Sequence, residues 1–137
     1  MCSPKRISDS RTTHVEILMP ADLNGYNRLF GGRLMQWIDV VAGGVARRHS
    51  GCEVTTASVD QLEFQAPAFV NDTIAMEGRI THVGRTSMEV RVDTYVEHLS
   101  DGMRYPINRA YFTMVGLDEK DKPCRIPRLT IKSEEEK

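Results

Sequence analysis

Residues 29 to 49 decide the fold, and they read LFGGRLMQWIDVVAGGVARRH. Their apolar residues recur at the roughly 3.6-residue spacing of a helix, which predicts one long helix from Leu29 to His49. On a helical wheel one broad arc collects the apolar positions, with one histidine: Leu34, Met35, Ile38, Val41, Ala42, Val45, Ala46 and His49. An arc this wide predicts a helix that protein surrounds over much of its surface.

Several residues of this helix are locally unfavourable. Gly43 and Gly44 each cost roughly 1 kcal/mol relative to alanine, and close helix packing is the simplest explanation for them. Gly31 and Gly32 begin the helix where a serine, threonine or aspartate would cap it better. Asp39 carries a charge at the border of the apolar arc. A carboxylate beside an apolar surface suits a site that handles a polar group on an apolar ligand, so we interpret Asp39 as functional.

Composition restricts the possible functions. The chain has 137 residues and a formal net charge of −1, which predicts one domain and argues against nucleic acid or a membrane as its main partner. No apolar run approaches the length of a membrane span, and the first residues lack the apolar core of a signal peptide. Three cysteines (Cys2, Cys52 and Cys124) have no metal-binding spacing. We therefore expect a cytoplasmic protein with no metal and no cofactor.

The rest of the chain reads as a strand before the helix and four strands after it. Period-two alternation is clearest from Met88 to Glu97. The other expected strands cover 12–19, 53–64 (with a bulge near Asp60 and Gln61), 74–81 and 105–117. Turns are expected at Gly84-Arg85 and at 100–102, and Gly51 is the expected helix C-cap. The domain boundaries that follow are a disordered segment at 1–11, a single domain at 12–128 and a flexible charged tail at 129–137.

This order predicts an α+β fold. The four later strands are expected to form an antiparallel meander, with the helix on one face of the sheet. A helix that is apolar beyond its sheet-facing side needs another surface to bury its remaining apolar residues. We expect a second copy of the chain to provide that surface.

Seven motifs, in this order, resemble the hotdog-fold acyl-CoA thioesterases, and most closely the bacterial and eukaryotic acyl-CoA hydrolases. They are Asp22-Leu23-Asn24, Leu29–Met35, Trp37-Ile38-Asp39, Ala46–His49, Val54–Asp60, Phe64–Pro67 and Val83–Val90. The resemblance extends from Val15 to Pro127. It implies a hotdog fold, in which an antiparallel sheet wraps around one long central helix. It also implies acyl-CoA as substrate and a homodimer with a continuous sheet, often assembled as a trimer of dimers into a hexamer.

One position departs from the family pattern. Asn27 stands where the family usually has glycine, and asparagine is the residue other than glycine that best accepts positive φ. Some relatives also carry an asparagine of the site at the position of Arg28. The resemblance therefore carries the asparagine role to Asn24.

Thioester hydrolysis needs an activated water and a positive pole for the developing oxyanion. The free amides of Gly31 and Gly32 at the helix start would supply that pole. Asp39 would activate the water, a role that the resemblance also assigns to it, and Asn24 would orient the water or the carbonyl. Because Gly32 and Asp39 lie seven residues apart, or about 10 Å along one helix, we expect each site to be shared between two subunits.

A second candidate site is the turn Gly84-Arg85-Thr86-Ser87. The simpler interpretation is a hairpin turn. The functional one, which the family suggests, places its N–H groups and Arg85 near the pantetheine or phosphates of CoA. Three further arginines are weaker phosphate candidates: Arg47, Arg48 and Arg109.

Other functions remain as alternatives. No Gly-x-Ser-x-Gly elbow occurs, which argues against a serine hydrolase. His14-x-Glu16 matches part of a deaminase zinc motif, but Cys124 has no cysteine partner at the required spacing. A hotdog hydratase or dehydratase needs a histidine at the site, and His49, which we expect to be a core or capping residue, is the only one on the helix. A non-catalytic acyl-CoA-binding protein is the last alternative.

Overall fold

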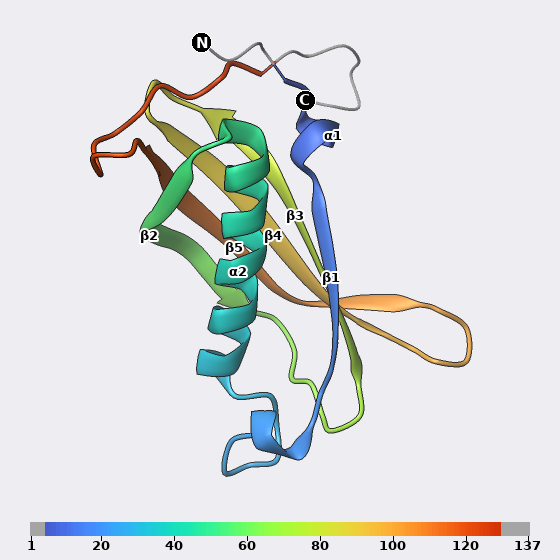
Figure 1. Ribbon diagram of the computed structural model, residues 1–137. Coiled ribbons are helices and arrows are strands. Elements are labelled where there is room, and N and C mark those ends of the chain that lie inside the picture. Colours follow the sequence, from blue (N-terminus) through green and yellow to red (C-terminus); the bar gives the residue numbers. More distant parts are fainter. Residues whose placement is uncertain (1–4, 130–137) are drawn as a thin grey trace.

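The computed structural model describes residues 5 to 129, which form one antiparallel sheet with a long helix across one face (Figure 1). This arrangement confirms the α+β class. In chain order the elements are α1 (Ile7–Ser10), β1 (Thr12–Ile17), η1 (Pro20–Asp22), α2 (Gly31–Ser50), β2 (Glu53–Phe64), β3 (Thr73–Val83), β4 (Ser87–Glu97) and β5 (Arg104–Leu117).

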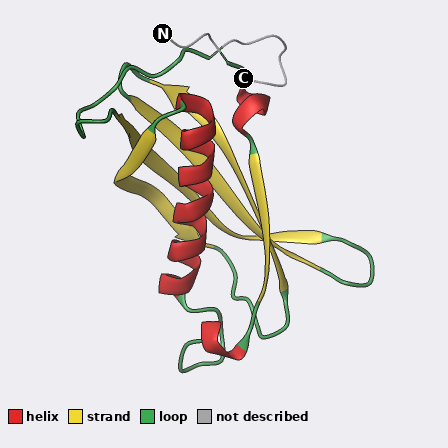
Figure 2. Cartoon of the chain, in the orientation of Figure 1, coloured by secondary structure: helices red, strands yellow, loops and turns green. Residues whose placement is uncertain are grey.

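The strand order is β1-β3-β4-β5-β2, and every pairing is antiparallel. Strands β3, β4 and β5 form the expected meander, but β2 does not pair with β3, so the prediction of a four-strand meander is wrong. Residues 65–72 carry the chain across the sheet from β2 at one edge to β3 near the other (Figure 2). Strand β1 then occupies the edge of β3 that β2 leaves open, with Val15 opposite Ala75.

Helix α2 packs through its apolar arc onto the sheet. The buried helix residues are Leu34, Ile38, Val41, Ala42, Val45 and Ala46, together with His49 and Ser50 at the end. Gly78 of β3 allows the helix to come this close, because a Cβ there would lie 2.9 Å from Val41 Cγ1 and 3.0 Å from Val45 Cγ2. The opposite side is open within one chain, where Val40 is 74% exposed. The expectation of a largely surrounded helix therefore fails for the single chain.

The C-terminal end of α2 is closed by backbone and side-chain hydrogen bonds. Gly51 has φ of 71° and donates its amide to the Arg47 carbonyl at 2.8 Å, which confirms it as the C-cap. His49 is fully buried, and its Nε2 lies 2.6 Å from the Pro127 carbonyl oxygen. The expected core role of His49 is thus confirmed.

The N-terminal segment is more ordered than expected. Residues 7–10 form the one-turn helix α1, with Ile7 and Ser10 buried, so the prediction of disorder over 1–11 does not hold for the described part. Residues 1–4, with Cys2, lie outside the described residues, and so does all of the tail at 129–137 except Leu129.

Two local predictions of backbone conformation are confirmed. The register of β2 against β5 shifts between Asp60 and Glu63, and Gln61 has φ of 50°, so the bulge lies where it was expected. A second shift occurs between Thr56 and Ser58. Asn27 has φ of 61°, in the left-handed region that its asparagine side chain tolerates.

Candidate functional site

The start of helix α2 presents bare backbone amides. The amides of Arg33 and Leu34 both donate to the Phe30 carbonyl, and Phe30 supplies no side-chain cap. Within residues 5–129, the amides of Gly31 and Gly32 have no acceptor. A Cβ built on Gly31 would meet only the Phe64 ring, at 3.6 Å, so glycine there is not a packing requirement. The helix start can therefore serve as a positive pole for an incoming oxygen atom.

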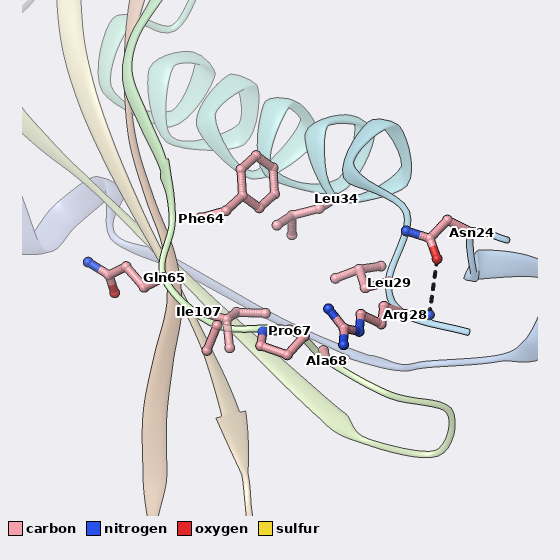
Figure 3. A pocket seen from close by; sticks show the side chains of 10 residues that line it. Asn24, Arg28, Leu29, Leu34, Phe64, Gln65, Pro67, Ala68 and Ile107 are labelled. Carbon is pink, nitrogen blue, oxygen red and sulfur yellow. Dashed lines mark hydrogen bonds between the residues drawn. The ribbon is translucent and has the colours of Figure 1, made fainter. Parts of the chain in front are cut away.

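Asn24 lies in the loop before α2, and its side chain organises that loop. Its Oδ1 accepts the amides of Tyr26 at 2.8 Å and Arg28 at 3.2 Å. Two backbone donors identify this atom as the oxygen, so Nδ2 is left as a donor. Figure 3 shows that amide nitrogen turned away from the bonded oxygen. Asn24 can therefore present an N–H group to a ligand carbonyl or water.

Asn24 lines a pocket of about 340 Å³ between the helix start and the end of β2 (Figure 3). The pocket has a polar end, with Asn24 and Arg28, and an apolar wall. The other lining residues are Leu29, Leu34, Phe64, Gln65, Ala66, Pro67, Ala68 and Ile107. Such a pocket suits a ligand with one polar group and an apolar body.

Asp39 lies in a different pocket, on the open side of the helix. Thr56 of β2 donates its hydroxyl to Asp39 Oδ1 at 2.7 Å and lies 3.3 Å from Met114 Sδ. The sequence interpretation missed Thr56. Strand alternation alone could not identify it, because the bulge between Thr56 and Ser58 resets which side chains face the helix. The carboxylate is thus oriented by one hydroxyl and open to the surface.

Gly43 and Gly44 line the same pocket as Asp39. A Cβ on either would find its nearest neighbour at 3.8 Å, which is ordinary contact. Close packing within the chain therefore does not explain these glycines, contrary to expectation. They widen the pocket instead.

The expected catalytic residues are divided between two places in one chain. Asn24 lines the pocket at the helix start and Asp39 the pocket beside β2, and no residue lines both. The amides of Gly31 and Gly32 lie near the first of these pockets, with Gly31 against Phe64. Within one chain the expected catalytic residues thus form two separate groups, the two candidate half-sites.

The turn at 84–87 is a hairpin turn with most of its backbone engaged. Gly84 donates its amide to Ser87 at 2.8 Å, so this N–H is not available to a phosphate as the functional interpretation required. The carbonyls of Arg85 and Thr86 accept the amides of Ile126 and Gly116. The Arg85 side chain is exposed and has no ion pair within the described part of the chain.

The weaker phosphate candidates are engaged elsewhere. Arg47 pairs with Glu53 at 2.7 Å, and Arg109 pairs with Asp93 at 3.0 Å. Arg48 donates to the Arg11 carbonyl. Each of these three arginines therefore already has a partner within the chain, which makes it a weaker candidate for binding a phosphate.

Within residues 5–129, the side chains that a zinc enzyme or a hydratase would use do not come together. His14 contacts Glu16, but no group of three or more metal-binding side chains occurs within residues 5–129. Burial lowers the pKa of His49, whose ring faces Pro127 rather than either half-site. In the same range no helix is long and apolar enough to cross a membrane.

Comparisons with known proteins place these features in a family. The sequence model of the thioesterase superfamily matches residues 26–101. An uncharacterized acyl-CoA thioester hydrolase of Bacillus subtilis is 39% identical over 128 residues, covering 93% of this chain and 74% of the relative. The cytosolic acyl coenzyme A thioester hydrolase of Rattus norvegicus is 33% identical over 98% of this chain, which spans only 36% of that longer protein.

Solved structures agree closely with the fold. An apo-hexameric acyl-CoA thioesterase has 36% identity and a TM-score of 0.92, over 98% of this chain and 86% of its own. An acyl-CoA hydrolase from Staphylococcus aureus, solved with butyryl-CoA, CoA and CoA disulfide, has 30% identity and a TM-score of 0.92, over 96% and 80%. Three alanine variants of that enzyme have also been solved, replacing an asparagine, an aspartate and a threonine. These likenesses confirm the hotdog fold.

Proposed function

The chain belongs to the thioesterase superfamily, and from that premise we propose that it hydrolyses acyl-CoA to a carboxylic acid and CoA. The observation that carries the proposal is the Asp39 carboxylate, oriented by Thr56 at 2.7 Å in an open pocket. A carboxylate in this setting can take a proton from water as the water attacks a thioester carbonyl.

The half-site at the helix start complements this base. During attack the carbonyl oxygen gains negative charge. The amides of Gly31 and Gly32, which have no acceptor in the described chain, offer fixed donors for that oxygen. Asn24 Nδ2 adds a side-chain donor beside them. The breaking C–S bond then leaves CoA as a thiolate, which takes up the proton, and no cofactor is required.

The S. aureus variants support this set of residues. In that enzyme the replaced aspartate lies 15 residues after the replaced asparagine, and the replaced threonine 17 residues after the aspartate. Asn24, Asp39 and Thr56 have the same two separations. The correspondence supports Thr56 as the positioning residue of the base.

We propose that the two half-sites meet between subunits of a homodimer. Gly32 and Asp39 lie about 10 Å apart along one helix, whereas attacking water and carbonyl must come within about 3 Å. Two antiparallel helices related by a two-fold axis would bring the start of one beside the Asp39 of the other. The hexameric state of related thioesterases supports such assembly, as a trimer of dimers.

We place the CoA end of the substrate at the turn formed by Gly84, Arg85, Thr86 and Ser87. The exposed Arg85 guanidinium suits a phosphate.

The location in the cell follows from a relative. The name of the rat relative supports a cytosolic location.

Thiol release tests the proposed activity. The purified oligomer, incubated with acyl-CoAs of increasing chain length, should release CoA, which a thiol reagent detects. A hydratase would instead change enoyl-CoA without releasing thiol, and a non-catalytic binding protein would bind acyl-CoA without consuming it. Either of those results would remove the hydrolase proposal.

Co-expression of two inactive variants tests the shared site. Subunits carrying Asn24→Ala and subunits carrying Asp39→Asn, each nearly inactive alone, should form hybrids in about half of the dimers. Each hybrid has one intact site, so roughly a quarter of wild-type activity should return. Two affinity tags verify that hybrids form. If they form without any gain in activity, each subunit carries its own complete site.

A further inference from the structure

Two thiols from distant parts of the chain meet near the C-terminal end of α2. Cys52 follows the C-cap of α2, and Cys124 lies in the segment after β5. The Cys124 thiol donates to Cys52 Sγ at 2.9 Å, although 72 residues separate them. A disulfide would require the two sulfur atoms to approach by only about 1 Å, to roughly 2.05 Å.

Backbone contacts on both sides hold the two thiols in place. The Cys52 amide donates to Ser50 Oγ at 3.1 Å. The Cys124 amide donates to the Gly116 carbonyl at 2.9 Å. Gly116 is required for this contact, because a Cβ there would lie 3.0 Å from Cys124 Sγ and 2.7 Å from Ile126 Cδ1. The backbone of the folded chain therefore holds the two thiols in contact.

A small molecule can reach the pair. Both cysteines line an open surface groove, whose charged lining residues are Glu53, Asp118, Glu119 and Lys120. Glu53 is paired with Arg47, and the ammonium of Lys120 lines the groove with the carboxylates of Asp118 and Glu119, so the groove keeps a small negative charge. The groove thus favours a neutral or positively charged reactant.

We propose that Cys52 and Cys124 form a reversible disulfide in reaction with a small disulfide compound. The Cys52 thiolate attacks one sulfur of the compound, whose S–S bond breaks, and the first thiol departs with a proton. Cys124 then attacks the Cys52 sulfur of the mixed disulfide, and the second thiol departs with the Cys124 proton. Two protein thiols are oxidised and one small disulfide is reduced to two thiols.

The environment of Cys124 indicates the order of attack. Burial, reinforced by the hydrogen bond to Cys52, raises the pKa of Cys124 to about 11. Cys124 therefore stays protonated near neutral pH and is a poor first nucleophile. Its contact with Cys52 places it to complete the second step.

The disulfide would connect the end of α2 to the segment that supports the turn at 84–87. In that segment the Ile126 amide donates to the Arg85 carbonyl, and Gly116 of β5, whose carbonyl accepts the Cys124 amide, donates its own amide to the Thr86 carbonyl. Oxidation would therefore slow the opening of these hydrogen bonds. In a reducing compartment the dithiol is the resting form, and the disulfide is transient.

The test uses the 137-residue chain with Cys2→Ser, which leaves only this pair of its three cysteines, and cystamine, a small dicationic disulfide. Intact mass should fall by two hydrogens, and proteolysis should yield a peptide pair linked through Cys52 and Cys124. Adding Cys124→Ser should stop the reaction at a stable mixed disulfide on Cys52. Adding Cys52→Ser should slow the reaction at least about tenfold.

Two controls keep the interpretation specific. Dithiothreitol should restore both thiols, and hydrogen exchange of the Gly116 and Ile126 amides should be slower in the disulfide form. Stable mixed disulfides without the cross-link would overturn the proposal, as would a cross-link that forms only in denaturant. None of these readouts uses thioester hydrolysis, so their failure is distinguishable from failure of the proposed activity.

Discussion

The first and last turns of helix α2 differ in whether their polar groups have hydrogen-bond partners within the chain. At the last turn, Gly51 donates its amide to the Arg47 carbonyl and His49 Nε2 contacts the Pro127 carbonyl, so these polar groups have partners inside the fold. At the start, Gly31 and Gly32 leave their amides without acceptors in the described chain, and Asp39 lies open two turns later.

The difference distinguishes polar groups that stabilise the fold from polar groups that are left available to a ligand. A helix end that leaves amides bare gives up stabilisation that a capping side chain would supply, on the order of 1 kcal/mol. Such a loss is expected where another molecule must make the missing bonds. Mutations should therefore affect activity at one end of α2 and stability at the other.

The largest effect is expected for Asp39→Asn. The amide cannot take a proton from water, so turnover should fall by at least roughly 10²-fold, while the thermal unfolding midpoint changes little. Thiol release and calorimetry on the same oligomer give both quantities. Asp121→Asn, in an exposed turn with φ of 60°, is the matched control and should retain full activity. Near-normal rates in correctly assembled Asp39→Asn would remove this residue from the mechanism.

Gly31→Ala should be the next most damaging to activity. The added methyl group fits beside Phe64 at 3.6 Å and favours helix, so stability should be unchanged or higher. The methyl would nevertheless hold the thioester away from the amides and lower kcat/KM roughly 10- to 100-fold. Gly25→Ala, where a Cβ meets nothing within 4 Å, is the control. Full activity in Gly31→Ala would mean that substrate does not approach the helix start.

Thr56→Val should reduce turnover about tenfold, because it removes the hydroxyl that orients Asp39 while keeping the shape of the side chain. Thr56→Ser retains the hydroxyl and should recover most of the rate. The two kcat values, measured at saturating acyl-CoA, distinguish positioning from packing. Equal losses in both variants would show that the methyl group, not the hydroxyl, matters.

Arg85→Ala should act on binding alone. If the guanidinium contacts a CoA phosphate, KM for acyl-CoA should rise about three- to tenfold and depend less on salt, with kcat nearly constant. Arg85→Lys retains the charge, so its KM should lie between those of the wild type and Arg85→Ala. An unchanged KM with intact assembly would leave Arg85 as a turn residue only.

The smallest effect on activity is expected at the last turn, for His49→Gln. Burial lowers the pKa of His49, and its Nδ1 has no partner in the described chain. Below the unfolded-state pKa of about 6.5, the unfolded chain takes up a proton that the folded chain resists, so the free energy of unfolding falls as pH drops. His49→Gln lacks this contribution. Denaturant melts from pH 7.5 to 5.5 should therefore show a shallower decline than wild type, with kcat unaffected.

Local patterns in the sequence predicted much of this structure. The 3.6-residue spacing located α2 to within two residues at its ends, and strict alternation located β4. Asp39 was identified because a charge at the border of an apolar arc is unfavourable without a use. The helix and strand predictions succeed because each depends on residues that are neighbours in the chain, whereas the functional role of Asp39 stays a prediction.

Long-range arrangements were not predictable in the same way. The alternation of β2 does not specify its neighbour, so its position beside β5 could not be derived. The bond from Thr56 to Asp39 depends on a bulge and on the height of the helix above the sheet. Ile7 reads as part of a polar segment, yet it is buried once the chain folds back.

The position of β2 at the end of the sheet has a consequence for folding in the cell. A twelve-residue strand with no partner on its outer side in the described chain is a long template on which a foreign or misfolded strand could add. The two register shifts increase the local twist of this edge, so a flat strand fits it poorly. Subunits at low concentration, such as newly made chains, are therefore expected to be the most aggregation-prone form, and assembly would protect them by mass action.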